Sequence, residues 1–185
     1  MGRLTDVGPA GLVPAAWLVT IAAHRSLVAE RTLLIALAVM DVLLLAFIVA
    51  SRGEMTGPVL PIWRRVLVAG FVVTVTGTVG LAVDPNQPFL TAVGLYGWIA
   101  LPAVAYVQTG QAHAPGRYRQ VYLASGALSL LGGAVYALGH VASIAPETTV
   151  IVGLALVGIG QTAGIVTAAL QNTAAGDSRG ARAPT

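Results

Sequence analysis

The sequence places one carboxylate, Asp41, near the middle of an otherwise apolar run from Thr32 to Ala50. A helix rises about 1.5 Å per residue, so a run of this length can span the roughly 30 Å hydrocarbon core of a bilayer. A carboxylate at that depth costs on the order of 3 kcal/mol on insertion scales, and such residues commonly mark ion or proton pathways. An isolated carboxyl favours its neutral form, so we expect Asp41 to be protonated and to seek an acceptor on another helix.

Further polar side chains are expected at the same depth as Asp41. Counted from the ends of their apolar runs, they complete a candidate intramembrane polar site: Thr74, Thr76, Trp98, Ser129 and Gln161. Pro102 lacks an N–H and should leave the carbonyl of Trp98 free to accept a hydrogen bond from elsewhere. Such a layer could hold a solute or relay a proton. It could equally be interhelical hydrogen bonding, in which each contact contributes about 0.6 kcal/mol.

No set of residues has the spacing of a catalytic or metal site. His24 and His140 are expected near one membrane face with Asp84 and Glu147, but without the local spacing of metal ligands. The sequence contains no cysteine and no lysine, which excludes thiol chemistry and a Schiff-base lysine. We therefore predict no cofactor, no metal and no catalytic residue.

Small residues recur at four-residue spacing in the last apolar run, at Gly160, Gly164 and Ala168. In lipid, such a face allows the close backbone approach on which helix association depends. The face could pack within the chain, or it could contact a partner membrane subunit or a second copy. The pattern predicts a helix-packing face and leaves its occupant open.

The composition is that of a membrane protein. Of the 185 residues, 56% are hydrophobic and 9% are charged, whereas a soluble domain has about 25% charged residues. The apolar residues form long runs rather than the short alternating patterns of a soluble core. No soluble domain is expected, which excludes most enzyme classes.

The runs predict an all-α fold, a bundle of six transmembrane helices in three antiparallel hairpins. Residues 1–171 form this domain and 172–185 a disordered cytoplasmic tail. The alternative is five spans, with the first apolar run at the membrane interface. Pro9, Gly11 and Pro14 lie near the start of this run and weaken it as a transmembrane helix. The six expected spans are Val7–Ala23, Thr32–Ala50, Val66–Val83, Phe89–Val107, Gln120–Val141 and Thr149–Leu170.

The basic residues predict the orientation. With six spans, Arg25 and Arg31 lie on one side and the other eight arginines on the opposite side. This asymmetry places both termini in the cytoplasm and explains the net charge of +3 without nucleic acid as a partner. Four aromatic residues are expected at the same cytoplasmic interface: Trp63, Tyr106, Tyr118 and Tyr122.

These observations predict a multi-pass protein of the cell (plasma) membrane with the lipid bilayer as its surroundings. The leading interpretation is a non-catalytic accessory or assembly subunit that acts through helix–helix contacts. The alternative is a small-solute or proton-coupled transporter that uses Asp41, and a lipid-directed membrane enzyme comes third. The arginine-bearing loops could also contact anionic lipid, at about 1 kcal/mol per arginine.

Overall fold

The computed structural model describes residues 2–50, 60–84, 88–112, 114 and 116–180, with side chains described from residue 11 to residue 171 outside the gaps. All secondary structure in the described residues is α-helical. The six helices are α1 (Gly2–His24), α2 (Glu30–Ala50), α3 (Leu60–Val83), α4 (Pro88–Ala112), α5 (Gly116–His140) and α6 (Pro146–Gly180).

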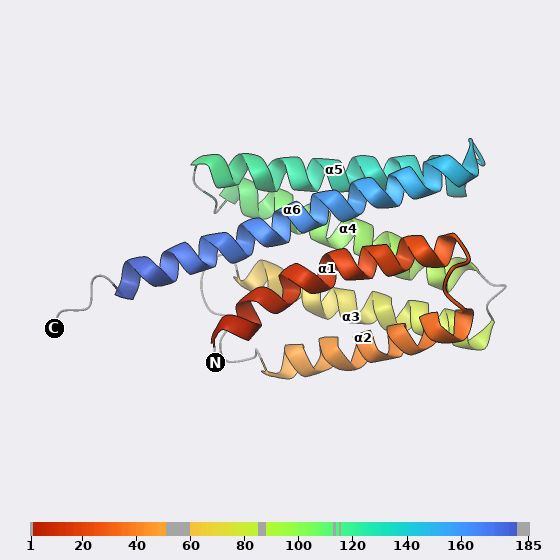
Figure 1. Cartoon of the computed structure of the whole chain (residues 1–185), viewed down its shortest axis with the longest axis horizontal. Coiled ribbons are helices and arrows are strands. Elements are labelled where there is room, and N and C mark those ends of the chain that lie inside the picture. Colours follow the sequence, from red (N-terminus) through yellow and green to blue (C-terminus); the bar gives the residue numbers. More distant parts are fainter. Residues whose placement is uncertain (1, 51–59, 85–87, 113, 115, 181–185) are drawn as a thin grey trace.

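Five of the six helices are long and apolar enough to cross a membrane, namely α2 to α6. In α1, the described apolar stretch is the shorter segment Gly11–His24. The helices run lengthwise and alternate in direction, so that the start of α1 and the end of α6 lie at the same end of the bundle (Figure 1). We call this end, which also holds the start of α3, the arginine-rich end, because Arg64, Arg65, Arg117 and Arg119 lie there.

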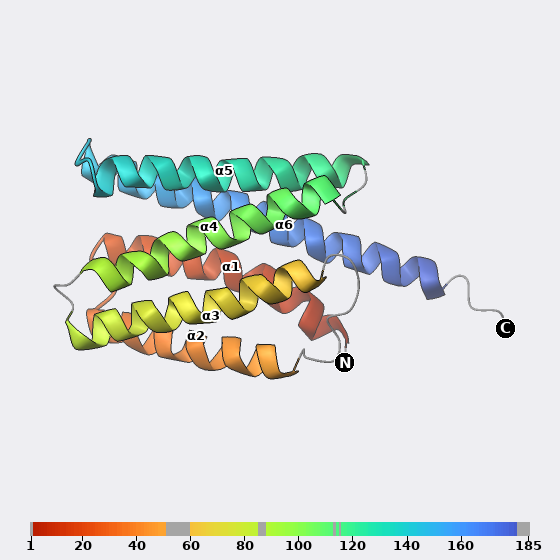
Figure 2. The same ribbon diagram turned by 180° about the vertical axis from the view of Figure 1, so that it is seen from behind.

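Two of the three expected hairpins are packed units, α3 with α4 and α5 with α6, and the first is not. In space they follow the order α2, α3, α4, α5, α6, α1, and each packs mainly on its neighbours in that order (Figures 1 and 2). The prediction that α1 and α2 pack together as a hairpin is therefore wrong, because α1 lies against α6 rather than α2. The reason is the side chain of Trp17, which is 7% exposed and packs on Gly158, Leu154 and Val157 of α6.

Two helix ends differ from the expected spans. α3 begins at Leu60 rather than Val66, so that Trp63, Arg64 and Arg65 belong to its first turns. Proline is tolerated at the start of a helix, and Pro61 occupies that place. α6 continues to Gly180, through residues 172–180 of the segment expected to be disordered. This stretch is proline-free and contains Ala174 and Ala175, which favour helix.

The core lies where α4, α5 and α6 meet, and glycine makes their close approach possible. At Gly132 of α5, a Cβ would lie 2.7 Å from the carbonyl oxygen of Gly153 on α6. Tyr106 and Tyr122 fill this region and are 1% and 2% exposed. These two rings pack on each other inside the bundle, with centroids 6.1 Å apart, rather than on its outer surface.

The small-residue face of α6 also packs inside the chain. A Cβ at Gly160 would lie 2.9 Å from the carbonyl oxygen of Ser125 and from Oγ of Ser129, both on α5. A Cβ at Gly164 would overlap the ring of Tyr106 on α4, and Ala168 is half-buried. The sequence left open whether this face packs within the chain or on another subunit. In the structure, Gly160 packs on α5 and Gly164 on α4 of the same chain.

Candidate functional site

A chain of hydrogen bonds crosses the bundle centre, and the side chain of Gln161 on α6 lies in its middle. Gln161 Oε1 accepts a hydrogen bond from the indole N–H of Trp17 on α1, over 3.1 Å. Its Nε2 donates to the carbonyl oxygen of Trp98 on α4, over 2.8 Å. Pro102 provides no N–H for this carbonyl, and the expectation that it would accept from outside its helix is confirmed.

The chain continues from Trp98 to α3. The indole N–H of Trp98 donates to Thr74 Oγ1 over 2.8 Å, and the Thr74 hydroxyl donates to the carbonyl oxygen of Gly70 over 2.7 Å. Gly70 makes room for this contact, because a Cβ there would lie 2.7 Å from the ring of Trp98. Tyr106 adds a further bond from α4, since its hydroxyl donates to the backbone carbonyl of Gln161 over 2.8 Å. Four helices, α1, α3, α4 and α6, are thus joined through polar groups at the centre.

Asp41 on α2 meets Thr78 on α3, one turn from Thr74. The Thr78 hydroxyl donates to Asp41 Oδ2 over 2.7 Å and also lies 3.0 Å from the carbonyl oxygen of Thr74. A hydroxyl carries one hydrogen and can fully satisfy only one of these acceptors. If Asp41 is protonated, its own O–H can instead donate to Thr78, which then donates to Thr74. One bond joins α2 and α3 in either state, but its direction depends on the proton of Asp41, and only the protonated acid leaves the Thr78 hydrogen for the Thr74 carbonyl.

The second carboxyl oxygen of Asp41 is in a different situation. Oδ1 is buried and has no hydrogen-bond partner among the described residues. Burying a polar atom without a partner costs about 1–3 kcal/mol in proteins, and less where a neutral acid replaces a carboxylate. Oδ1 is therefore the oxygen of Asp41 that can still accept a hydrogen bond from a further donor.

The structure brings together only part of the expected polar site. Thr74, Trp98 and Gln161 belong to one chain of bonds, and Asp41 lies beside it through Thr78. Thr76 instead donates to Val72 on its own helix, over 2.9 Å. Ser129 likewise donates within its own helix, to the carbonyl oxygen of Ser125 over 2.8 Å, where α5 meets α6.

Three residues of the network were missed by counting depth along each run: Trp17, Thr78 and Tyr106. Thr78 continues the four-residue spacing of Gly70 and Thr74, and this spacing is the signal that could have found it. Trp17 and Tyr106 carry no such signal, because their contacts depend on which helices are neighbours.

A second group of rings lies at the opposite end from the arginine-rich end. His24 Nδ1 lies 2.9 Å from the carbonyl oxygen of Thr20, so this nitrogen carries the proton, and Nε2 lies 3.1 Å from the Tyr136 hydroxyl. In neutral His24, Nε2 therefore accepts from Tyr136. The ring of Tyr136 also packs on Tyr96 and His140. No group of three potential metal ligands occurs in the part of the chain that the structure describes.

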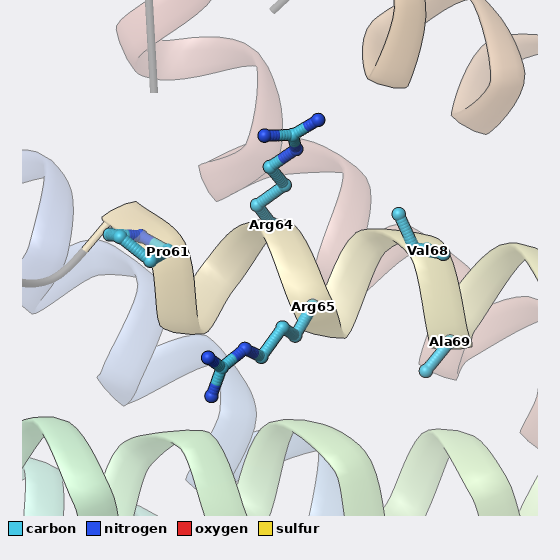
Figure 3. Close-up of a pocket in the computed structure, with 5 residues that line it drawn as sticks. All are labelled: Pro61, Arg64, Arg65, Val68 and Ala69. Carbon is cyan, nitrogen blue, oxygen red and sulfur yellow. The ribbon is translucent and has the colours of Figure 1, made fainter. Parts of the chain in front are cut away.

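A cavity of about 520 Å³ opens beside the first turns of α3. Its described lining residues all come from α3: Pro61, Arg64, Arg65, Val68 and Ala69. The two arginine side chains leave the helix in different directions, and Val68 and Ala69 lie one turn farther along (Figure 3). The arrangement combines cationic groups at the helix start with an apolar surface beyond them.

Comparison of the chain with protein-family models, curated proteins and solved structures gave no match.

Proposed function

We propose that the chain is a six-span protein of the cell membrane, with both termini in the cytoplasm, and that it is a non-catalytic accessory or assembly subunit. The distribution of arginines supports the orientation. Arg64, Arg65, Arg117 and Arg119 lie at one end of the bundle and Arg25 at the other, as the positive-inside rule requires for this topology.

The observation that carries the subunit role is the exposure of α2. Among the residues of this helix, only Leu44 is buried, and within the described part of the chain α2 packs mainly against α3. Its outer face is a continuous apolar surface, with Val39 52%, Val42 67% and Ile35 55% exposed. Because lipid tails are as apolar as these side chains, no hydrophobic effect holds α2 in the bundle. A transmembrane helix of a partner subunit on this face would supply the packing that the chain itself does not.

The bundle centre supports a structural role for the polar groups there. Gln161, Trp98, Thr74, Trp17 and Tyr106 bond to one another and hold four helices in a fixed arrangement. Groups that are already paired in this way gain less from binding a solute, since each bond to the solute replaces an existing one. The partner would therefore dock on a pre-organised bundle.

Purification in a mild detergent, with identification of bound membrane proteins by mass spectrometry, tests this role. Val42→Trp changes the shape of the exposed α2 face and keeps it apolar, and we expect it to lose the partner. Ile159→Trp is the matched control, because Ile159 is 60% exposed on α6, and this variant should retain the partner. If both variants and the unmodified chain purify alone as one monodisperse species, the subunit role is wrong.

A second candidate is a proton-coupled transporter of a small solute in which Asp41 carries the proton. One observation favours it: the bond pattern between Asp41, Thr78 and Thr74 changes with the protonation of Asp41, and Oδ1 is unpaired among the described residues. In proteoliposomes, Asp41→Asn keeps the shape of the side chain and removes its titration. Proton flux that is lost in this variant supports the transporter, and unchanged flux excludes Asp41 as the carrier.

A further inference from the structure

The cavity lies beside the start of the apolar span of α3. The apolar span of α3 runs from Pro61 to Val83. Arg64 and Arg65 are therefore about 5 Å from its start, and Val68 and Ala69 are about one turn deeper, at 1.5 Å per residue. The 23 residues of this span rise about 35 Å, which exceeds a hydrocarbon core of about 30 Å. With α3 across a bilayer, the two arginines would therefore lie near the phosphates, and Val68 and Ala69 near the upper acyl carbons.

The charges at the cavity are available for a ligand. Both arginine side chains are exposed, and neither has a hydrogen bond or ion pair among the described residues. Two further arginines of the described residues, Arg117 and Arg119, lie at the same end, in the first turn of α5. An anion is therefore favoured at this end, and a guanidinium can bind two phosphate oxygens at once.

The start of α3 is fixed in place by an aromatic contact. The ring of Trp63 packs edge-to-face on Tyr106 of α4, with centroids 5.0 Å apart. Tyr106 is in turn bonded to the backbone of Gln161 on α6. The backbone from which Arg64 and Arg65 extend is thus held by two other helices, and only their side chains need to move to reach a common ligand.

We propose that this cavity binds the phosphate of an anionic phospholipid, with Arg64 and Arg65 on the phosphate and Val68 and Ala69 against the first acyl carbons. The cavity has a volume of about 520 Å³ and is open to its surroundings. The apolar surface next to the arginines distinguishes this site from an exposed basic patch, because it gives a lipid an advantage over a phosphate ion. The site does not depend on the partner proposed for α2.

Native mass spectrometry of the protein from nanodiscs of phosphatidylcholine with one-fifth phosphatidylglycerol tests the proposal. We expect at least one retained phosphatidylglycerol per chain, and about tenfold weaker retention in the double variant Arg64→Gln, Arg65→Gln. The control double variant Arg117→Gln, Arg119→Gln removes the same charge at the same end outside the cavity, and it should retain the lipid. Equal loss in the two double variants would show surface electrostatics only and overturn the site.

Two further arms separate the lipid from a free phosphate and from misfolding. Inorganic phosphate added to phosphatidylcholine nanodiscs should not raise the thermal unfolding midpoint as phosphatidylglycerol does; an equal rise would overturn the lipid as ligand. Val68→Trp fills the cavity without changing the charge and should also release the lipid. Val72→Trp is its control on the same helix, since Val72 is 57% exposed and does not line the cavity. Lipid retention in Val68→Trp equal to that in Val72→Trp would contradict the proposal.

Discussion

The side-chain amide of Gln161 on α6 donates a hydrogen bond to the backbone carbonyl of Trp98 on α4, over 2.8 Å. In a regular helix this carbonyl would accept from the N–H of residue 102, which is proline here. In a membrane, an unpaired carbonyl is costly because no water is present to replace the bond. Gln161 thus repairs, from a neighbouring helix, the backbone bond that Pro102 removes.

This compensation predicts a coupling between positions 161 and 102. Gln161→Leu should destabilise the fold by about 1–2 kcal/mol, because it leaves the Trp98 carbonyl and the Trp17 indole without partners. In a Pro102→Ala background the helical N–H returns, and the same change should cost less. A double-mutant cycle of unfolding free energies in mixed micelles measures the difference. Equal costs in the two backgrounds would show that Gln161 does not compensate for Pro102.

Gly164 of α6 is expected to be intolerant of a single added methyl group. Gly164→Ala would place Cβ against the ring of Tyr106 on α4, and we expect a loss of about 1–3 kcal/mol. The control is Gly11→Ala on α1, where nothing lies within 4 Å of the new Cβ. This change should be neutral, or stabilising by up to about 1 kcal/mol through helix propensity. Comparable unfolding free energies for the two variants would refute the packing described for α6.

Two threonines of α3 allow a matched test of the Asp41 contact. Thr78→Val removes the bond to Asp41 and should cost about 0.6–1.7 kcal/mol in a membrane environment. Thr76→Val removes only a bond within α3 and should change the unfolding free energy by a few tenths of a kcal/mol. If Asp41→Leu already removes the contact, Thr78→Val should have a smaller effect in that background. An unchanged effect would mean that the Asp41–Thr78 bond does not stabilise the pair of helices.

The absence of native cysteine makes the topology testable with single-cysteine variants. Leu27 and Val141 lie at one end of the bundle, and their side chains are 78% and 72% exposed. Each is replaced by cysteine in a separate variant. With six spans, both should react with a membrane-impermeant maleimide added to intact cells, whereas Arg3→Cys and Gln111→Cys should react only after permeabilisation. Labelling of Arg3→Cys in intact cells would mean that α1 does not cross the membrane.

Local patterns predicted the helices better than they predicted their partners. The long apolar runs correctly indicated an all-helical apolar bundle, and the missing N–H of Pro102 correctly indicated an external donor for Trp98. Both depend on residues close in sequence. The pairing of α1 with α6 depends instead on Trp17 fitting against Gly158 and bonding to Gln161. Such a contact between distant residues has no local periodicity.

The candidate polar site shows the same limit. Depth along each helix could be counted, and it identified Thr74, Trp98 and Gln161, which the structure brings together. The rotation of each helix about its own axis could not be counted, because apolar residues surround these helices on all sides and give no preferred buried face. Thr76 was therefore included although its hydroxyl bonds within α3, and Thr78 was left out.

Photocrosslinking from α2 in native membranes shows whether α2 carries a partner subunit. A cysteine-reactive photocrosslinker would be attached to Val42→Cys and, as the control, to Ile159→Cys on the exposed face of α6. We expect a covalent adduct with a different membrane protein from position 42 and none from position 159. An adduct of two copies of this chain, or the same products from both positions, would contradict this expectation.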